Sequence, residues 1–177
     1  MTLIISGTNR IGSLSKIIAQ YYHHHISQLG HESKVISLES LPLEILSPEL
    51  YSSTYKSPLI NFQEETFIPA ERIVFITPEY NGGIPGVLKL FIDALSSNDR
   101  RFQFLGKKAA LVGISSGRGG NIRGLDHLTG ILHYLQVNVF PYKLSIPNIT
   151  SHISNGVLID TKTKSLFDNQ MEQFLAY

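Results

Sequence analysis

The sequence contains no cysteine and few charged residues, and these absences exclude several classes of protein. Without cysteine the chain has no disulfide, no thiolate metal site and no cysteine nucleophile. Charged residues are 16% of the 177 residues and the formal net charge is +1. So weak a charge produces no broad field that attracts nucleic acid or an anionic membrane. We therefore expect no nucleic-acid partner and no membrane partner.

We expect neither a signal peptide nor a membrane-spanning segment from the sequence. It begins MTLIISG, a short apolar run without the basic flank of a signal peptide. No apolar segment approaches the length that crosses a bilayer. The hydrophobic fraction of 42% is that of a globular chain, and the length suits one core. We expect a cytoplasmic protein with a single domain over residues 1–177.

Short apolar runs alternate with helix-like segments along the chain. Several runs are nearly continuous in Ile, Val, Leu, Phe and Ala, which is typical of parallel strands covered on both faces. The expected strands are residues 3–5, 34–38, 72–77, 109–114 and, more weakly, 137–140. Apolar spacings of three and four predict helices over residues 13–29, 85–95, 122–135 and 161–175. This alternation predicts an α/β fold with three layers around a doubly wound, five-stranded parallel sheet.

Residues 39–70 are less regular, because prolines interrupt them. We expect a surface excursion there, with a short helix near residues 62–67. A doubly wound sheet binds ligands beyond the carboxyl ends of its strands. The connections after the first, third and fourth strands are therefore the ones expected to form a site.

The first connection, residues 6–15, is rich in groups that bind anions. The unpaired amides at the start of the following helix favour a negative charge. The hydroxyls of Thr8, Ser13 and Ser15 add hydrogen-bond donors, and Arg10 adds a positive charge. The connection therefore predicts a phosphate site, and the alternative is an N-capping cluster in an ordinary loop.

Two common nucleotide motifs do not fit this connection. Gly7 and Gly12 have the spacing of a Walker loop, but Ser13 and Leu14 follow where that motif needs Lys and then Ser or Thr. The connection also lacks G-x-G-x-x-G. Hydrolysis of a nucleoside triphosphate and binding of a pyrophosphate are both disfavoured, so a monophosphate is the expected ligand.

The second and third connections offer a flat surface and close backbone approach. In residues 77–96, Tyr80 supplies an aromatic ring, and Asn81, Gly82 and Gly83 permit tight turns. Residues 113–124 form another cradle of small residues and carry two arginines. Together the three connections predict a phosphate bound at the first and a flat ring between the other two, which is the shape of FMN.

Three segments of the sequence resemble the signature segments of a known family. GTNRIGSLS, PEYNGGIPGVLKLFIDALS and SSGRGG look like those of the NADPH-dependent FMN reductase family, in matching order from residue 2 to residue 141. That family includes flavodoxin-like quinone, azo-dye and chromate reductases. The resemblance implies a flavodoxin-like fold with bound FMN.

The resemblance also implies which residues bind the cofactor. The phosphate and ribityl group of FMN would be held by Thr8, Arg10, Ser13, Leu14 and Ser15. The ring and its ribityl link would be lined by Pro78, Glu79, Tyr80, Asn81 and Gly82. The far edge of the ring would be approached by Ser115, Ser116, Gly117 and Arg118. Hydride would pass from NAD(P)H to FMN and on to a quinone-like, azo or other small electron acceptor. No protein acid, base or nucleophile is required for this chemistry, so no catalytic residue is expected. Family members are usually homodimers or homotetramers, with the flavin near a subunit interface.

Three positions depart from the family pattern. Leu90 stands where the family often has Asn, Ala94 where it often has Trp, and Ser15 where it often has Asn. The first two lie on the helix after the second connection and bear on subunit contacts more than on flavin binding. Ser15 keeps a polar group at its position.

Other readings of the sequence remain open. A flavodoxin-type electron carrier would share the fold, although such carriers are strongly acidic and this chain is nearly neutral. A flavin-binding sensor would keep the fold without turnover. A hydrolase would need a set such as Ser13, Asp93 and His127, but the G-x-S-x-G turn that usually presents such a serine is absent.

The remaining charged and histidine residues have ordinary structural explanations. His23, His24 and His25 are consecutive, so on a helix they point in three directions and do not form a metal site. Lys89 and Asp93 are four residues apart and are expected to pair on a helix surface. We expect His127 and His133 to be ordinary helix residues. Glu79 is the one acid that we do not assign to the surface.

Overall fold

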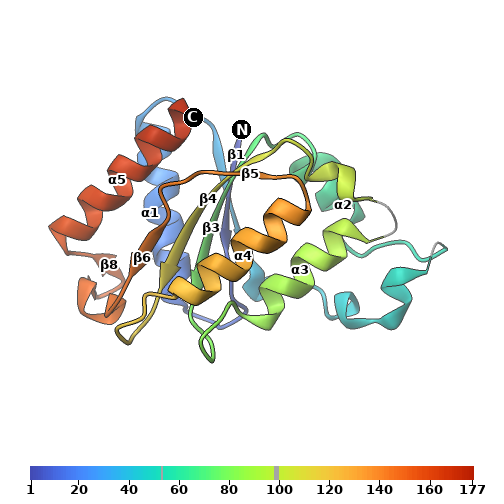
Figure 1. Ribbon diagram of the computed structural model, residues 1–177, viewed down its shortest axis with the longest axis horizontal. Helices are drawn as coiled ribbons and strands as arrows, with labels where there is room; N and C mark the ends of the chain where they lie inside the picture. Colours follow the sequence, from blue (N-terminus) through green and yellow to red (C-terminus); the bar gives the residue numbers. More distant parts are fainter. Residues whose placement is uncertain (53, 98–99) are drawn as a thin grey trace.

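A parallel β-sheet forms the centre of the molecule, which we describe from a computed structural model covering residues 1–52, 54–97 and 100–177 (Figure 1). The strand order is β2-β1-β3-β4-β5, with β6 also pairing with β4, and every pairing in this sheet is parallel. The strands are β1 (Thr2–Ser6), β2 (Ser33–Ser37), β3 (Arg72–Pro78), β4 (Lys108–Ile114), β5 (Asn138–Val139) and β6 (Leu144–Ile146). The predicted α/β fold with a doubly wound parallel sheet is confirmed.

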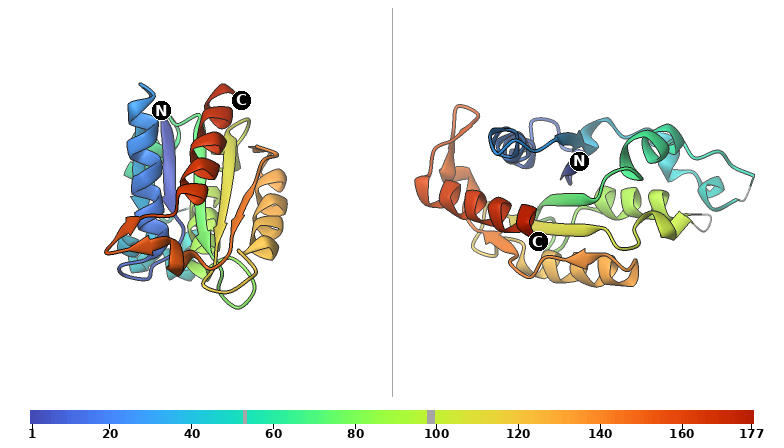
Figure 2. Two further views of the ribbon diagram at one scale, coloured as in Figure 1. Left: turned by 90° about the vertical axis from the view of Figure 1, so that its left-hand side faces the viewer. Right: turned by 90° about the horizontal axis from the view of Figure 1, so that it is seen from above.

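Helices cover both faces of the sheet and complete the three layers (Figure 2). On one face α1 (Leu14–Gln28) and α5 (Thr161–Ala176) pack against side chains such as Ile4 and Val74. On the other face α3 (Gly86–Ser96) and α4 (Ile122–Tyr134) pack against Leu3, Ile5 and Ile73. Neighbouring strand residues thus point to opposite faces, and both faces are apolar because both are covered.

Beside β4 the structure has two short strands, where the sequence predicted a single strand over residues 137–140. Of these, β5 pairs with Lys108 and Ala109, and β6 pairs with Val112–Ile114. Pro141 lies between them. A proline has no backbone N–H for the ladder, which explains why pairing stops there and resumes later.

Residues 38–67 form a chain of short helices. These are η1 (Leu38–Ser40), η2 (Leu43–Leu46), η3 (Pro48–Tyr51), α2 (Ile60–Phe62) and η4 (Gln63–Phe67). The predicted helix near residues 62–67 is confirmed. The expectation of a wholly surface excursion is wrong, because Ile45, Leu50, Leu59 and Phe67 are buried in the core on the α3 side.

The C-terminal segment belongs to the same core as α1. After β6 come η6 (Ile149–His152), the antiparallel hairpin of β7 (Ile153–Ser154) and β8 (Val157–Leu158), and then α5. One further short helix, η5 (Arg100–Gln103), lies earlier in the chain, just before β4. The N-cap Asp160 accepts a hydrogen bond from the Thr163 amide at 2.7 Å, so α5 begins with a satisfied cap. Within the described ranges, no helix combines the length and the hydropathy that a membrane span requires.

A buried polar network fastens α5 to the sheet and to α1. Gln170 is 0% exposed, and its Nε2 donates to the carbonyl oxygens of Tyr142 at 2.8 Å and Leu111 at 3.2 Å. Its Oε1 accepts from the Tyr22 hydroxyl at 2.7 Å. Burial raises the pKa of Tyr22 well above its ordinary value, so the hydroxyl keeps its proton and remains a donor.

We expect Gln170→Leu to lower the free energy of unfolding by about 2–3 kcal/mol, because it leaves buried polar groups without a partner. Gln173→Leu, on the exposed side of the same helix, is the control and should change stability by less than about 0.5 kcal/mol. Urea unfolding measures both variants. Equal stability of the two would contradict the role given to the network.

Candidate functional site

Three loops meet at the carboxyl edge of the sheet, as the topology requires. They follow β1, β3 and β4 and enclose a cavity of about 380 Å³. Ten of the fourteen residues that the sequence assigns to the site line this cavity: Thr8, Arg10, Ser13, Leu14, Ser15, Pro78, Glu79, Tyr80, Ser115 and Ser116. The structure thus brings together residues from segments more than 100 positions apart.

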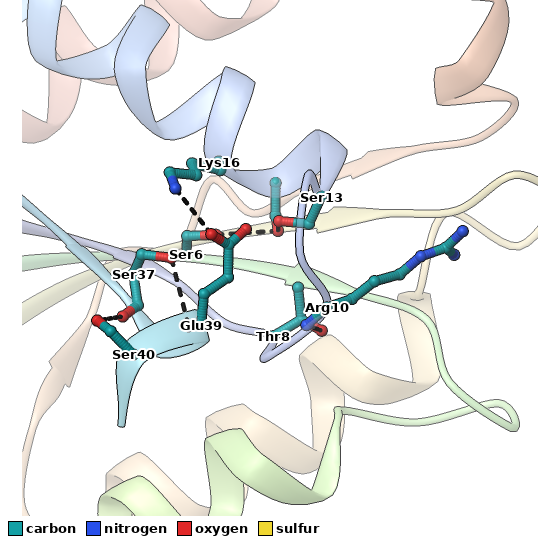
Figure 3. A network of polar contacts seen from close by, with 9 residues as sticks. Ser6, Thr8, Arg10, Ser13, Lys16, Ser37, Glu39 and Ser40 are labelled. Carbon is teal, nitrogen blue, oxygen red and sulfur yellow. Dashed lines mark hydrogen bonds and ion pairs between the residues drawn. The ribbon is translucent and has the colours of Figure 1, made fainter. Parts of the chain in front are cut away.

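The first loop carries a chain of hydroxyl groups beside the start of α1. Ser15 Oγ donates to Ser13 Oγ at 3.0 Å and lies 3.0 Å from Ser6 Oγ. Ser13 is the N-cap residue, yet its side chain makes no cap hydrogen bond. This disfavours the alternative of a simple N-capping cluster. Figure 3 shows Arg10 extending from this loop away from the other labelled side chains.

Gly7 allows the first loop to lie directly against β3. Its amide donates to the Ile76 carbonyl at 2.8 Å. A Cβ atom at this position would lie 3.0 Å from the Ile76 oxygen and 3.1 Å from the Leu88 side chain. A larger residue would need the loop or its neighbours to shift by a few tenths of an ångström, so glycine allows this close approach to β3.

The second loop is a two-residue turn of type I′. Asn81 and Gly82 have φ angles of 51° and 77°, and the amides of Tyr80 and Gly83 each donate to the other residue's carbonyl at 3.0 Å. The Tyr80 hydroxyl lies 2.8 Å from Thr8 Oγ1, which also accepts from the Arg10 amide at 3.2 Å. The aromatic residue expected to offer only a flat ring therefore also joins the second loop to the first.

Glu79 and Asn121 join the second loop to the third. The Asn121 amide donates to Glu79 Oε2 at 3.1 Å, and Asn121 Nδ2 donates to the Pro78 and Thr77 carbonyls at 2.9 Å and 3.1 Å. Glu79, the one acid that was not assigned to the surface, is half-buried, and its carboxylate contacts the backbone of the third loop. Sequence reasoning missed Asn121, which lies in a left-handed conformation just before α4.

The third loop is fixed from inside and from a fourth segment. Ser115 Oγ donates to the Gly117 carbonyl at 2.8 Å and accepts from the Gly120 amide at 2.7 Å. The amides of Asn148 and Ile149 donate to the carbonyls of Gly117 and Ser115, both at 2.9 Å. The segment after β6 therefore forms part of the cavity wall.

Five lining residues were missed by sequence reasoning: Ile11, Gly12, Ile114, Ile149 and Thr150. The last two belong to a segment to which the sequence analysis assigned no role. A signal was present, because Pro147 and Asn148 form a turn-prone pair directly after the apolar run of β6. The carboxyl end of β6 lies beside that of β4, so this turn reaches the same edge.

Four assigned residues are not among those that line the cavity in the described part of the chain: Asn81, Gly82, Gly117 and Arg118. Asn81 and Gly82 form the tip of the second loop. Gly117 lies in the third loop, where its carbonyl accepts two hydrogen bonds, and Arg118 follows it as an exposed residue.

Other sequence expectations lie elsewhere in the fold. Lys89 Nζ contacts both Asp93 carboxylate oxygens at 2.8 Å, which confirms that pair. Asp93 and His127 line a groove between α3 and α4, whereas Ser13 lines the site cavity, so the hydrolase set is not assembled. His23 lies 2.8 Å from Ser33 and His25 lies 3.3 Å from Asp168, so these neighbours have different partners.

The three departures from the family pattern also have defined places. Ser15 is buried within the hydroxyl chain. Ala94 is 0% exposed in the core of this chain. Leu90 lines a separate cavity between α3 and residues 38–46.

The donor set of the main cavity suits a phosphorylated planar cofactor. Of the described residues that line it, Arg10 is the only cation and Glu79 the only carboxylate. Glu79 is engaged with the Asn121 amide. Hydroxyls and Arg10 thus gather at the first loop, and the Tyr80 ring with the apolar side chains of Ile114 and Ile149 lines the rest. These residues fit FMN.

Comparison with known proteins agrees with this geometry. Residues 1–151 match the sequence profile of the family described as NADPH-dependent FMN reductase. The chain belongs to that family. The resemblance predicted from the three signature segments is therefore confirmed.

Two curated relatives match over nearly the whole chain. An NAD(P)H-dependent FMN reductase of Pseudomonas aeruginosa is 29% identical over 174 residues, which cover 95% of this chain and 89% of the relative. An NADPH azoreductase of a Bacillus strain is 26% identical over 178 residues, covering 99% of this chain and 90% of the relative.

Solved structures show the same fold. A flavoenzyme NAD(P)H:acceptor oxidoreductase of Paracoccus denitrificans superposes with a TM-score of 0.81 at 20% identity, covering 99% of this chain and 94% of that one. A short-chain flavodoxin associated with a bacterial microcompartment superposes with a TM-score of 0.60 at 14% identity, covering 99% and 95%. The predicted flavodoxin-like fold is confirmed.

We expect Tyr80→Phe to lower the free energy of unfolding by about 1 kcal/mol, the usual contribution of one partly buried hydrogen bond. The hydroxyl removed is the one that contacts Thr8, whose side chain is 0% exposed. Tyr51→Phe, an exposed tyrosine, is the control and should be neutral. Urea unfolding gives both values, and a neutral Tyr80→Phe would show that the link between the loops adds no stability.

Proposed function

We propose that the protein is an FMN-dependent NAD(P)H oxidoreductase that reduces a quinone-like, azo or other small electron acceptor. The observation that carries the proposal is the single cavity formed by the three loops, with hydroxyls and Arg10 at one end and an aromatic and apolar surface along the rest. The family membership supports the cofactor and the reaction type. The Pseudomonas and Bacillus relatives support a nicotinamide as the hydride donor.

In this proposal each loop binds a different part of FMN. The first loop binds the phosphate and ribityl group through Thr8, Arg10, Ser13, Leu14 and Ser15. The second loop lies along the ring through Pro78, Glu79, Tyr80, Asn81 and Gly82. The third loop reaches the far edge through Ser115, Ser116, Gly117 and Arg118.

The protein's own contribution to the reaction is binding and orientation. When bound, FMN supplies the redox chemistry that links hydride donor and acceptor. Charge-assisted hydrogen bonds from Arg10 and the serine hydroxyls would anchor the phosphate. The hydrogen bonds between the loops hold Tyr80 and Ser115 in place before any ligand binds, which reduces the entropy lost on binding. No side chain is required as an acid, base or nucleophile.

The proposal extends to the organisation of the protein. We propose one FMN-binding domain over residues 1–177, because η6 and α5 complete the cavity wall and the core. A homodimer or homotetramer is proposed as well. NAD(P)H as co-substrate favours a cytoplasmic location.

The alternatives are a flavodoxin-type electron carrier and a flavin-binding sensor without turnover. The fold alone does not separate them, because a flavodoxin shares it. Single-turnover mixing of the flavin-loaded protein with NADPH or NADH does separate them. Rapid bleaching of the flavin absorbance supports the enzyme, and its absence supports a carrier or sensor.

We expect the purified, desalted protein to show the absorption spectrum of bound flavin. Combining Arg10→Ala with Ser13→Ala should weaken FMN binding by about a hundredfold, because two phosphate contacts, one of them from a charged donor, are lost. Quenching of FMN fluorescence measures the dissociation constant.

The control for this variant combines Lys162→Ala with Ser165→Ala, two exposed residues of α5. It removes the same kinds of group far from the first loop and should keep the original affinity. Unchanged FMN binding in the Arg10 and Ser13 variant would place the phosphate elsewhere.

A further inference from the structure

An ion pair from outside the cavity meets the loop that is proposed to bind phosphate. Glu39 lies in η1, directly after β2, and its carboxylate reaches the start of α1 (Figure 3). Lys16 Nζ, on the first turn of α1, lies 2.7 Å from Glu39 Oε2. The side chains of Lys16 and Glu39 are 42% and 12% exposed, so the carboxylate is the more buried partner.

The Glu39 carboxylate also faces the backbone of the first loop. Lys16, followed by the amides of Ser13 and Gly12, favours the charged carboxylate and lowers the pKa of Glu39 below its usual value. Negative charge at the start of a helix is further stabilised by the helix dipole. The second oxygen, Oε1, is buried and has no hydrogen-bond partner among the described residues.

The turn that carries Glu39 is itself held in place. The Glu39 amide donates to Ser37 Oγ at 3.4 Å, and Ser40 Oγ donates to the Ser37 carbonyl at the same distance. Leu38 is buried in the core beside them. The carboxylate is therefore presented from a fixed turn at the end of β2.

Glu39 lies on a different side of the loop from the proposed cofactor. Arg10, Gly12, Ser13 and Ser15 line the main cavity, and Glu39 does not line it. Glu39 instead lines the separate cavity between residues 38–46 and α3. The carboxylate thus supports the loop without occupying the space that the first loop encloses.

We propose that Glu39 and Lys16 are positioning residues that hold the β1–α1 loop in the shape that binds the FMN phosphate. This inference rests on the proposed function. Arg10, Ser13 and Ser15 of this loop line the main cavity, whereas Glu39 lines the separate cavity on the α3 side. The pair therefore acts on the phosphate through the loop and not by contact.

Comparison of FMN with riboflavin tests this role, because riboflavin lacks only the phosphate. Both ligands are titrated into full-length protein freed of flavin. Glu39→Gln and Lys16→Met should each weaken FMN binding about fivefold and leave riboflavin binding unchanged. The double variant should be no weaker than the worse single variant, since each change removes the same pair. Lys16→Arg should keep the FMN affinity.

Lys89→Met is the matched control. It breaks an ion pair of similar length and lysine exposure on α3, away from the first loop, and should change neither affinity. Three outcomes overturn the proposal: unchanged FMN binding in Glu39→Gln, equal losses for FMN and riboflavin, or tighter FMN binding. Tighter binding would show that the carboxylate repels the phosphate instead of positioning its loop.

Failure of the proposed phosphate site gives a different result. In that case the variant combining Arg10→Ala with Ser13→Ala keeps the wild-type preference for FMN over riboflavin. If that variant loses the preference and Glu39→Gln keeps it, the phosphate site stands and only the positioning role is overturned.

Discussion

The hydrogen bonds that join the loops to one another determine the shape of the site. A parallel sheet brings the loops to one edge, but it does not fix how they sit relative to each other. Thr8 with Tyr80 joins the first loop to the second, and Glu79 with Asn121 joins the second to the third. These contacts between side chains and backbone of the protein fix how the three loops lie around the cavity.

Much of the fold was predictable because it depends on local patterns. Apolar runs covered on both faces marked β1, β3 and β4, and apolar spacings marked the long helices. The replacement of the last predicted strand by β5 and β6 was not predictable, because strands of two and three residues are too short to show an alternating apolar pattern. Burial of Ile45 and Phe67 was missed because proline breaks and polar neighbours resemble a surface segment.

The site was predictable to the extent that it is built from loop composition. Small and hydroxyl residues after three strands indicated a phosphate and a ring, and the structure places most of those residues around one cavity. The contributions of Asn121, Thr150 and Glu39 depend on contacts between distant segments. The pair Pro147 and Asn148 marks a turn before Thr150, but a single sequence does not show which distant residues such a turn contacts.

The short strands at the edge of the sheet have a consequence for association between copies of the chain. At one edge, β5 and β6 are two and three residues long and are separated by Pro141. At the other edge, β2 carries the exposed Lys34. Brief, interrupted or charged edges are poor templates for a strand from another molecule. The sheet thus resists growing into a continuous intermolecular sheet, which leaves the helical faces as the surfaces on which copies can meet.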